Sequence, residues 1–190
     1  MSWAVNVGKK EVRVITDWKD PITPYLNQNS EKVPTLISYQ DEENPKWGFE
    51  AAISDQDRLR WFKVLLQPGH KYARVGDIVA DSKERLHKMN KTAKEVTADY
   101  LRMLWKHTTE HIAKHNLSGW SYCYKVVITV PAVWDEAAKL QTKESAKEAG
   151  ISDEISLVSE PEAAALAVFQ DKLGNRDILE VCACPASEII

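Results

Sequence analysis

The sequence is short of several features that would assign it to a common functional class. It contains no run of about 18 apolar residues, so we predict no membrane-spanning helix. Its first residues have neither a basic stretch nor a long apolar stretch, so we predict no secretory signal. The formal net charge of -3 offers no excess of basic residues for binding nucleic acid or anionic lipid. Three cysteines are too few for a disulfide framework and favour a reduced, cytoplasmic protein.

Metal-ligand patterns are also sparse. His107, His111 and His115 recur every four residues on a predicted helix, so two neighbours have the spacing of a metal-binding pair. No further ligand accompanies them in the sequence, and polar side chains on a helix surface are the alternative. Cys182 and Cys184 are separated by one residue, which is shorter than the two-residue gap of redox and zinc motifs. We predict a metal centre from neither set.

The N-terminal half predicts short strands and then a long helix. Residues 2–5 and 11–16 are β-prone and flank a turn, so we predict a hairpin. Residues 33–39 predict a strand at a sheet edge, because Pro34 cannot donate a ladder hydrogen bond. The further predicted elements of this half are a short strand at 47–49, a helix at 54–66 and the clearest helix of the chain at 92–116.

The second half of the chain alternates strand and helix. Residues 125–130 form a near-continuous apolar run that is typical of a strand buried on both faces, and Pro131 ends it. A helix is predicted at 135–149, with Gly150 suited to its C-terminal cap. Residues 155–158 predict the next strand. The order strand, helix, strand predicts a parallel pair with a right-handed crossover.

Glu160 stands between this last strand and an alanine-rich helix. Pro161 suits the first turn of that helix. One interpretation is that the Glu160 carboxylate caps the helix by accepting hydrogen bonds from its free N–H groups. The other is that the carboxylate faces a ligand. The residues themselves leave both interpretations open.

Two blocks of the sequence carry a family resemblance. They are VVITVPAVWDEAAKLQTKESAKEAGI at 126–151 and ISLVSEPEAAALAVF at 155–169. Together they resemble the ATPase domain of the heat-shock 70 chaperones. The stretches VPTLISYQDEENPKWGFEA and WFKVLLQP are similar to the divergent branch found in fungi and in the animal 12A/12B members.

This resemblance implies an α/β fold, the ribonuclease-H-like first lobe of the actin-like ATPases. Its mixed sheet would join an antiparallel hairpin to parallel βα units. The lobe would cover residues 1–174, with an insert subdomain at about 40–115 and a divergent tail at 175–190. The implied cofactors are ATP and Mg²⁺, and the implied partners are client and co-chaperone proteins.

The resemblance also implies roles for four residues. Glu160 would face the nucleotide cleft, hold Mg²⁺ through water and position the attacking water. Lys63 would lie near the γ-phosphate, with a solvated lysine as the alternative. Pro131 would act in an interdomain switch, with a plain strand terminator as the alternative. Lys139 stands where the family has the arginine partner of that switch, and lysine lacks the planar fork of arginine.

The sequence also departs from the family pattern. Neither of the two glycine-bearing phosphate loops of the family occurs in it, and its first residues resemble the segment after the first loop, so we expect the first strand of the lobe to be absent. We therefore expect a fragment of a chaperone ATPase domain that does not hydrolyse ATP alone, because phosphate positioning supplies most of the catalysis. The alternative is a non-catalytic protein-interaction module that binds no nucleotide.

Overall fold

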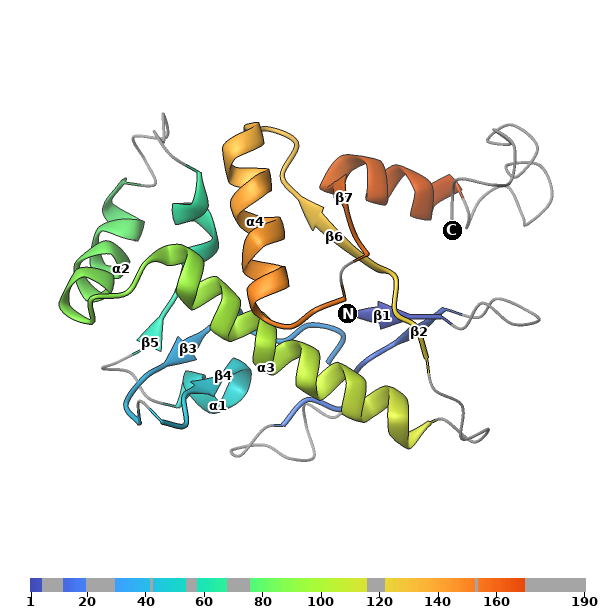
Figure 1. Cartoon of the computed structure of the whole chain (residues 1–190), viewed down its shortest axis with the longest axis horizontal. Helices are drawn as coiled ribbons and strands as arrows, with labels where there is room; N and C mark the ends of the chain where they lie inside the picture. The colour runs from blue at the N-terminus through green and yellow to red at the C-terminus, as the bar shows by residue number, and fades with distance from the viewer. Residues whose placement is uncertain are drawn as a thin grey trace.

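The computed structural model describes most of the chain between residues 1 and 169. The described residues form three small sheets and several helices, a mixed α/β arrangement as predicted (Figure 1). None of the helices in these stretches is long and apolar enough to cross a membrane. The described stretches are 1–4, 12–19, 30–41, 43–53, 58–67, 76–115, 122–152 and 154–169.

The predicted N-terminal hairpin is confirmed. Strand β1 (Ser2–Trp3) pairs antiparallel with β2 (Arg13–Val14), with Ser2 opposite Val14. The hairpin forms a sheet of its own. The expectation of one mixed sheet that joins the hairpin to the parallel strands is therefore wrong for the described residues. The β1–β2 ladder and the β6–β7 ladder are separate two-stranded sheets, and no strand among the described residues joins them.

A second sheet has three strands. Strand β3 (Ile37–Ser38) lies in the middle, with β4 (Lys46–Trp47) and β5 (Arg58–Leu59) antiparallel on its two sides. The prediction of an edge strand at 33–39 is therefore wrong. Pro34 precedes the two paired residues, so it does not have to donate to the ladder.

Gly48 turns the chain directly from β4 into a helix, α1 (Gly48–Ala52). Its φ of 58° is in the left-handed region, and a Cβ at this position would stand 2.6 Å from Cγ2 of Val33. The strand predicted at 47–49 therefore ends at Trp47.

Two further segments differ from the predictions. The helix predicted at 54–66 is replaced by β5 and by a 3₁₀ helix, η1 (Phe62–Leu66), while residues 54–57 lie outside the described ones. Helix α2 (Gly76–Lys88) has no counterpart among the predicted elements. Its ion pairs Arg85–Asp81 and Lys88–Glu84 have the i, i+4 spacing of a polar surface helix. Val79 and Leu86, seven residues apart, are buried on its inner face.

The long helix predicted at 92–116 is confirmed as α3 (Ala93–Lys114). Thr92 and Glu95 form a capping box: Thr92 Oγ1 accepts from the Glu95 N–H at 3.2 Å, and the Glu95 carboxylate accepts from the Thr92 N–H at 2.7 Å. One apolar cluster joins α3 to the three-stranded sheet, η1 and α2. Its buried members are Ile37, Tyr39, Leu59, Phe62, Leu86, Val96 and Tyr100.

The predicted strand–helix–strand unit is also confirmed. Strands β6 (Val126–Val130) and β7 (Ile155–Ser159) pair in parallel, and α4 (Glu136–Glu148) forms the crossover between them. Asp135 caps α4 by accepting from the Ala138 N–H at 2.9 Å. Gly150, at φ 78°, follows the helix in the left-handed conformation expected there.

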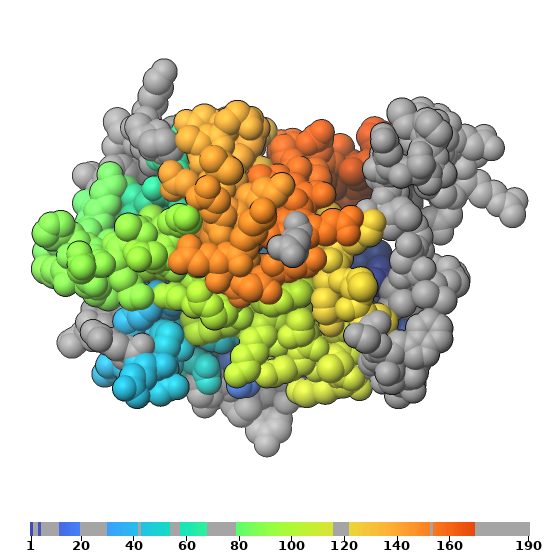
Figure 2. Space-filling view, viewed as in Figure 1, coloured from blue at the N-terminus to red at the C-terminus, as the bar shows by residue number. Residues whose placement is uncertain are grey.

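The prediction that β6 is buried on both faces is wrong. Helices α3 and α4 lie against each other in the space-filling view (Figure 2) and cover one face of the β6–β7 pair. Val127 points to the other face and is 62% exposed. Alternate side chains of a strand point to opposite faces, so a continuous apolar run does not by itself prove two buried faces.

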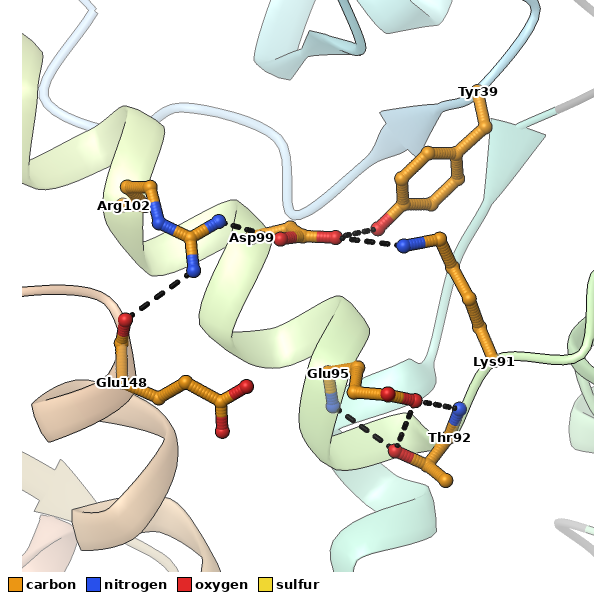
Figure 3. A network of polar contacts seen from close by, with 7 residues as sticks. All are labelled: Tyr39, Lys91, Thr92, Glu95, Asp99, Arg102 and Glu148. Atoms are coloured by element: carbon orange, nitrogen blue, oxygen red, sulfur yellow. Dashed lines mark hydrogen bonds and ion pairs between the residues drawn. The ribbon is translucent and has the colours of Figure 1, made fainter. Parts of the chain in front are cut away.

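A polar network connects α3 to the end of β3 and to α4 (Figure 3). Asp99 accepts hydrogen bonds from the Tyr39 hydroxyl at 2.7 Å, from Arg102 at 2.6 Å and from Lys91 Nζ at 3.2 Å. Arg102 also donates to the backbone oxygen of Glu148 at 3.2 Å. Burial alone would raise the pKa of Asp99, but the three hydrogen bonds outweigh burial and lower it. Burial and the bond to Asp99 raise the pKa of Tyr39.

Candidate functional site

The fold brings together the two residues proposed as catalytic from the sequence. Lys63 lies on η1, and Glu160 begins the helical residues 160–169 that follow β7. Lys63 Nζ lies 3.5 Å from Glu160 Oε1, although the two residues are 97 positions apart. Their side chains are 40% and 51% exposed. Such an exposed ion pair contributes roughly 0–1 kcal/mol. Both charged groups are therefore accessible to a ligand at small cost.

Ser159 and Glu162, and not Glu160, cap the helix at 160–169. Ser159 Oγ accepts from the Glu162 N–H at 3.3 Å, while the Glu162 carboxylate accepts from the Ser159 N–H at 3.2 Å and from its hydroxyl at 2.8 Å. These bonds to Ser159 lower the pKa of Glu162. The interpretation of Glu160 as the cap is therefore wrong. The sequence pattern Ser-x-x-Glu carried this signal.

Lys63 is positioned by buried neighbours on its own 3₁₀ helix. Phe62 packs into the cluster with α3, and Leu66 packs with β6 and α4. Trp61, directly before the helix, has a φ of 62°, an uncommon conformation for a tryptophan. The ammonium of Lys63 lies 5.6 Å from the centre of the Trp134 ring, within the range of a cation–π contact.

Pro131 and Lys139 do not join the ion pair in the described contacts. Pro131 follows β6, and its carbonyl oxygen accepts from the Trp134 N–H at 3.1 Å. Lys139 Nζ lies 2.7 Å from the carboxylate of Glu136, one turn away on α4. The charge of Lys139 also helps lower the pKa of Glu162, after the larger effect of Ser159.

Sequence reasoning did not identify Gln67 as a residue of this site. Its Nε2 donates to Asp135 Oδ2 at 2.8 Å, and its Oε1 accepts from the Asp135 N–H at 3.1 Å. The sequence indicated that Asp135 starts a helix, but no local pattern predicts a partner 68 residues away. Trp134 was likewise not singled out.

The site's donor set fits a magnesium–phosphate group. Among the described residues, no three His, Cys, Asp or Glu side chains are grouped to hold a metal directly. Mg²⁺ is commonly bound through one or two carboxylates together with water and substrate phosphates. The half-exposed Glu160 suits such a water-mediated contact, and the ammonium of Lys63 suits a phosphate oxygen.

The other sequence candidates lie elsewhere. His107 Nε2 and His111 Nδ1 lie 3.7 and 2.6 Å from the same oxygen of Asp17, and His107 stacks on the Trp18 ring. Burial lowers the pKa of His107. This cluster links α3 to the N-terminal segment. Cys182 and Cys184, with the predicted tail at 175–190, lie outside the described residues.

Comparison with known proteins identifies the family. A family model described as Hsp70 protein matches residues 72–181, more than half of the chain. The chaperone protein DnaK of Ureaplasma parvum serovar 3 is 39% identical over 158 residues, 82% of this chain and 23% of that protein. The chaperone protein HscA homolog of Vibrio vulnificus is 41% identical over 87 residues, 46% of this chain and 13% of that protein. The chaperone protein dnaK of Cyanidium caldarium is 33% identical over 88 residues, again 46% and 13%.

The chain thus spans less than a quarter of the length of these curated relatives. The family match includes Pro131, Lys139 and Glu160 and begins after Lys63. By this match, and by the identity over most of its length to DnaK, the chain belongs to the Hsp70 family.

Proposed function

We propose that this chain carries Lys63 and Glu160 as cleft residues of an ATP-binding chaperone ATPase domain. The observation that carries the proposal is the 3.5 Å contact between the two side chains, which lie on separate elements and are both accessible. Lys63 would donate to a phosphate oxygen of ATP. Glu160 would accept hydrogen bonds from water on Mg²⁺ and from the attacking water.

The ion pair itself supports this role. In the described structure the two charges neutralise each other across the space between η1 and the start of the helix at 160–169. A bound phosphate would replace the Glu160 carboxylate as the anionic partner of Lys63. Mg²⁺ with its water would replace the Lys63 ammonium as the cationic partner of Glu160. Because the existing pair is exposed and weak, this exchange costs little.

By itself, the 190-residue polypeptide is proposed to hydrolyse ATP slowly or not at all. Neither phosphate-loop pattern of the family occurs in its sequence. Backbone N–H groups of such loops hold the phosphates in line, and this positioning supplies most of the rate enhancement in phosphoryl transfer. Lys63 and Glu160 supply charged groups, but they do not supply the backbone N–H groups that hold the phosphates in line.

The finer assignments from the sequence are part of the same proposal. They are a ribonuclease-H-like lobe at 1–174 with an insert at about 40–115, membership of the fungal-type or 12A/12B-like branch, and a switch role for Pro131 and Lys139. A cytoplasmic location and binding of client or co-chaperone proteins complete it. The sparse cysteines support the location.

A second candidate function is a protein-interaction module without nucleotide binding. It is favoured by apolar side chains exposed on the helix at 160–169. Leu166, Val168 and Phe169 are each at least half exposed there. Exposed large apolar residues gathered on one element are typical of an interaction surface.

Thermal unfolding of the purified chain with and without Mg²⁺-ATP distinguishes the two candidates. A ligand that binds the folded state raises the melting temperature. We expect a rise with Mg²⁺-ATP, no rise with Mg²⁺ alone, and loss of the rise in Lys63→Ala. Lys88→Ala is the matched control, because Lys88 forms a comparable exposed ion pair on α2.

A cooperative melt that ignores Mg²⁺-ATP would contradict nucleotide binding and favour the interaction module. The proposal of low activity is tested by phosphate release from ATP. Clear turnover that disappears in Glu160→Gln would show that this polypeptide is an ATPase without the family's phosphate loops.

A further inference from the structure

Gln67, directly after η1, and Asp135, directly before α4, are joined by a reciprocal pair of hydrogen bonds, here called the Gln67–Asp135 clamp. Gln67 Nε2 donates to Asp135 Oδ2, and the Asp135 N–H donates to Gln67 Oε1. The two bonds fix the orientation of the amide, because a rotated amide would face its NH₂ to an N–H and its oxygen to a carboxylate. The other carboxylate oxygen, Asp135 Oδ1, caps α4 through the Ala138 N–H.

The packing beside this clamp determines where Lys63 points. Leu66 is fully buried against Val130, Trp134 and Ala138. In a 3₁₀ helix, residues three apart lie on the same side. Lys63 is three residues before Leu66, and its ammonium lies over the Trp134 ring. The clamp and the Leu66 contact therefore hold η1, which carries Lys63, against Trp134 and α4.

We propose that Gln67 and Asp135 are positioning residues that hold Lys63 against Glu160; the inference rests on the proposed function of that pair. A lysine side chain loses rotamer entropy when it is held in one direction, and an exposed ion pair contributes too little to offset that loss. The contacts that hold η1 in place must therefore set the direction of the Lys63 side chain. On the side of α4, the Gln67–Asp135 clamp anchors η1 together with the buried Leu66.

The test measures the reactivity of Lys63 in the full chain without nucleotide. The chain is treated with a trace of an amine-acylating reagent at constant pH, and the extent of reaction at Lys63 is measured by peptide mass spectrometry. Lys83, exposed on α2, is the internal reference. The Glu160→Gln variant, which removes the negative partner, gives the acylation rate of Lys63 without its ion pair. We expect Gln67→Ala to raise the Lys63 rate about two- to fivefold, the range for breaking one exposed ion pair.

A pair of charge exchanges separates positioning from a general loss of structure. Gln67→Glu alone sets two carboxylates against each other and should release Lys63. Asp135→Asn alone keeps the oxygen that caps α4, but its NH₂ group then faces the NH₂ group of Gln67, and two donors cannot bond. This variant should therefore also release Lys63. In the double variant Q67E/D135N, the new amide at 135 donates to the new carboxylate at 67 while its oxygen still caps α4. We expect the Lys63 rate to return to that of the unmodified chain.

An unchanged Lys63 rate in Gln67→Ala, in variants shown by circular dichroism to be folded, would overturn the proposal. A double variant as reactive as Gln67→Glu would overturn it too. The melting shift with Mg²⁺-ATP tests the proposed function separately. Restored reactivity without any nucleotide shift leaves the clamp standing and rejects nucleotide binding. A nucleotide shift with an unresponsive Lys63 rejects the clamp.

Discussion

Replacing Asp99 by alanine tests whether the network of Figure 3 holds α3 against the three-stranded sheet. The Asp99 side chain is 20% exposed and accepts the hydrogen bond of the buried Tyr39 hydroxyl. A hydrogen bond to a charged partner contributes about 1.5–3 kcal/mol. The ion pairs to Lys91 and Arg102 are partly in water and add under about 1 kcal/mol each. We expect Asp99→Ala to lower the free energy of unfolding by about 2–4 kcal/mol.

Urea unfolding followed by circular dichroism measures this loss at pH 7. Asp99→Asn keeps an acceptor for Tyr39 but removes the charge, so we expect about half of the loss. Lys88→Ala, which breaks an ion pair with both side chains about two-thirds exposed, should leave the midpoint unchanged.

The pH dependence gives a second readout for Asp99. Its pKa is lower in the folded state than in the unfolded chain, so its charge stabilises the fold above the unfolded pKa of about 3.9. This contribution is lost as the pH falls through the folded pKa. The difference between the unmodified chain and Asp99→Asn should therefore shrink below about pH 4. A loss below about 0.5 kcal/mol in Asp99→Ala, or equal losses in both variants, would refute the reasoning.

Two further predictions concern backbone strain and a buried imidazole. Gly48→Ala should destabilise the chain more than Gly150→Ala in the same urea assay, because both have positive φ but only at Gly48 does a Cβ meet Val33, at 2.6 Å; equal losses would contradict the clash. Burial lowers the pKa of His107 against a smaller opposing effect of Asp17, so the unfolded chain takes up the proton more readily. Stability should therefore fall as the pH drops below about 6.5. The melting temperature of His107→Phe should fall less between pH 7 and 5, and an equal fall would show that other groups dominate.

The periodic elements of the C-terminal half were predictable from the sequence. The apolar run at 126–130, the capping residue Asp135 and Gly150 are local signals, and each corresponds to an observed strand, cap or helix end. The long helix α3 was predictable for the same reason, because apolar residues recur along one face of it at helical spacing and such a pattern is local.

The first 90 residues were harder to predict for a physical reason. Their strands are two residues long, too short for an alternating pattern to show. The 3₁₀ helix η1 depends on the contacts of Phe62 and Leu66 with two different clusters. Tertiary packing decided these elements.

For the candidate site, too, part was predictable from the sequence and part was decided by the tertiary structure. The sequence by itself determined that a carboxylate, Glu160, follows a parallel strand at the start of a helix, and family resemblance pointed to Lys63. Only the tertiary structure placed Lys63 Nζ beside Glu160 and paired Gln67 with Asp135. These partners are 97 and 68 residues apart, so no local propensity encodes them. Their contacts exist because buried side chains of η1, β6 and α4 share one apolar cluster.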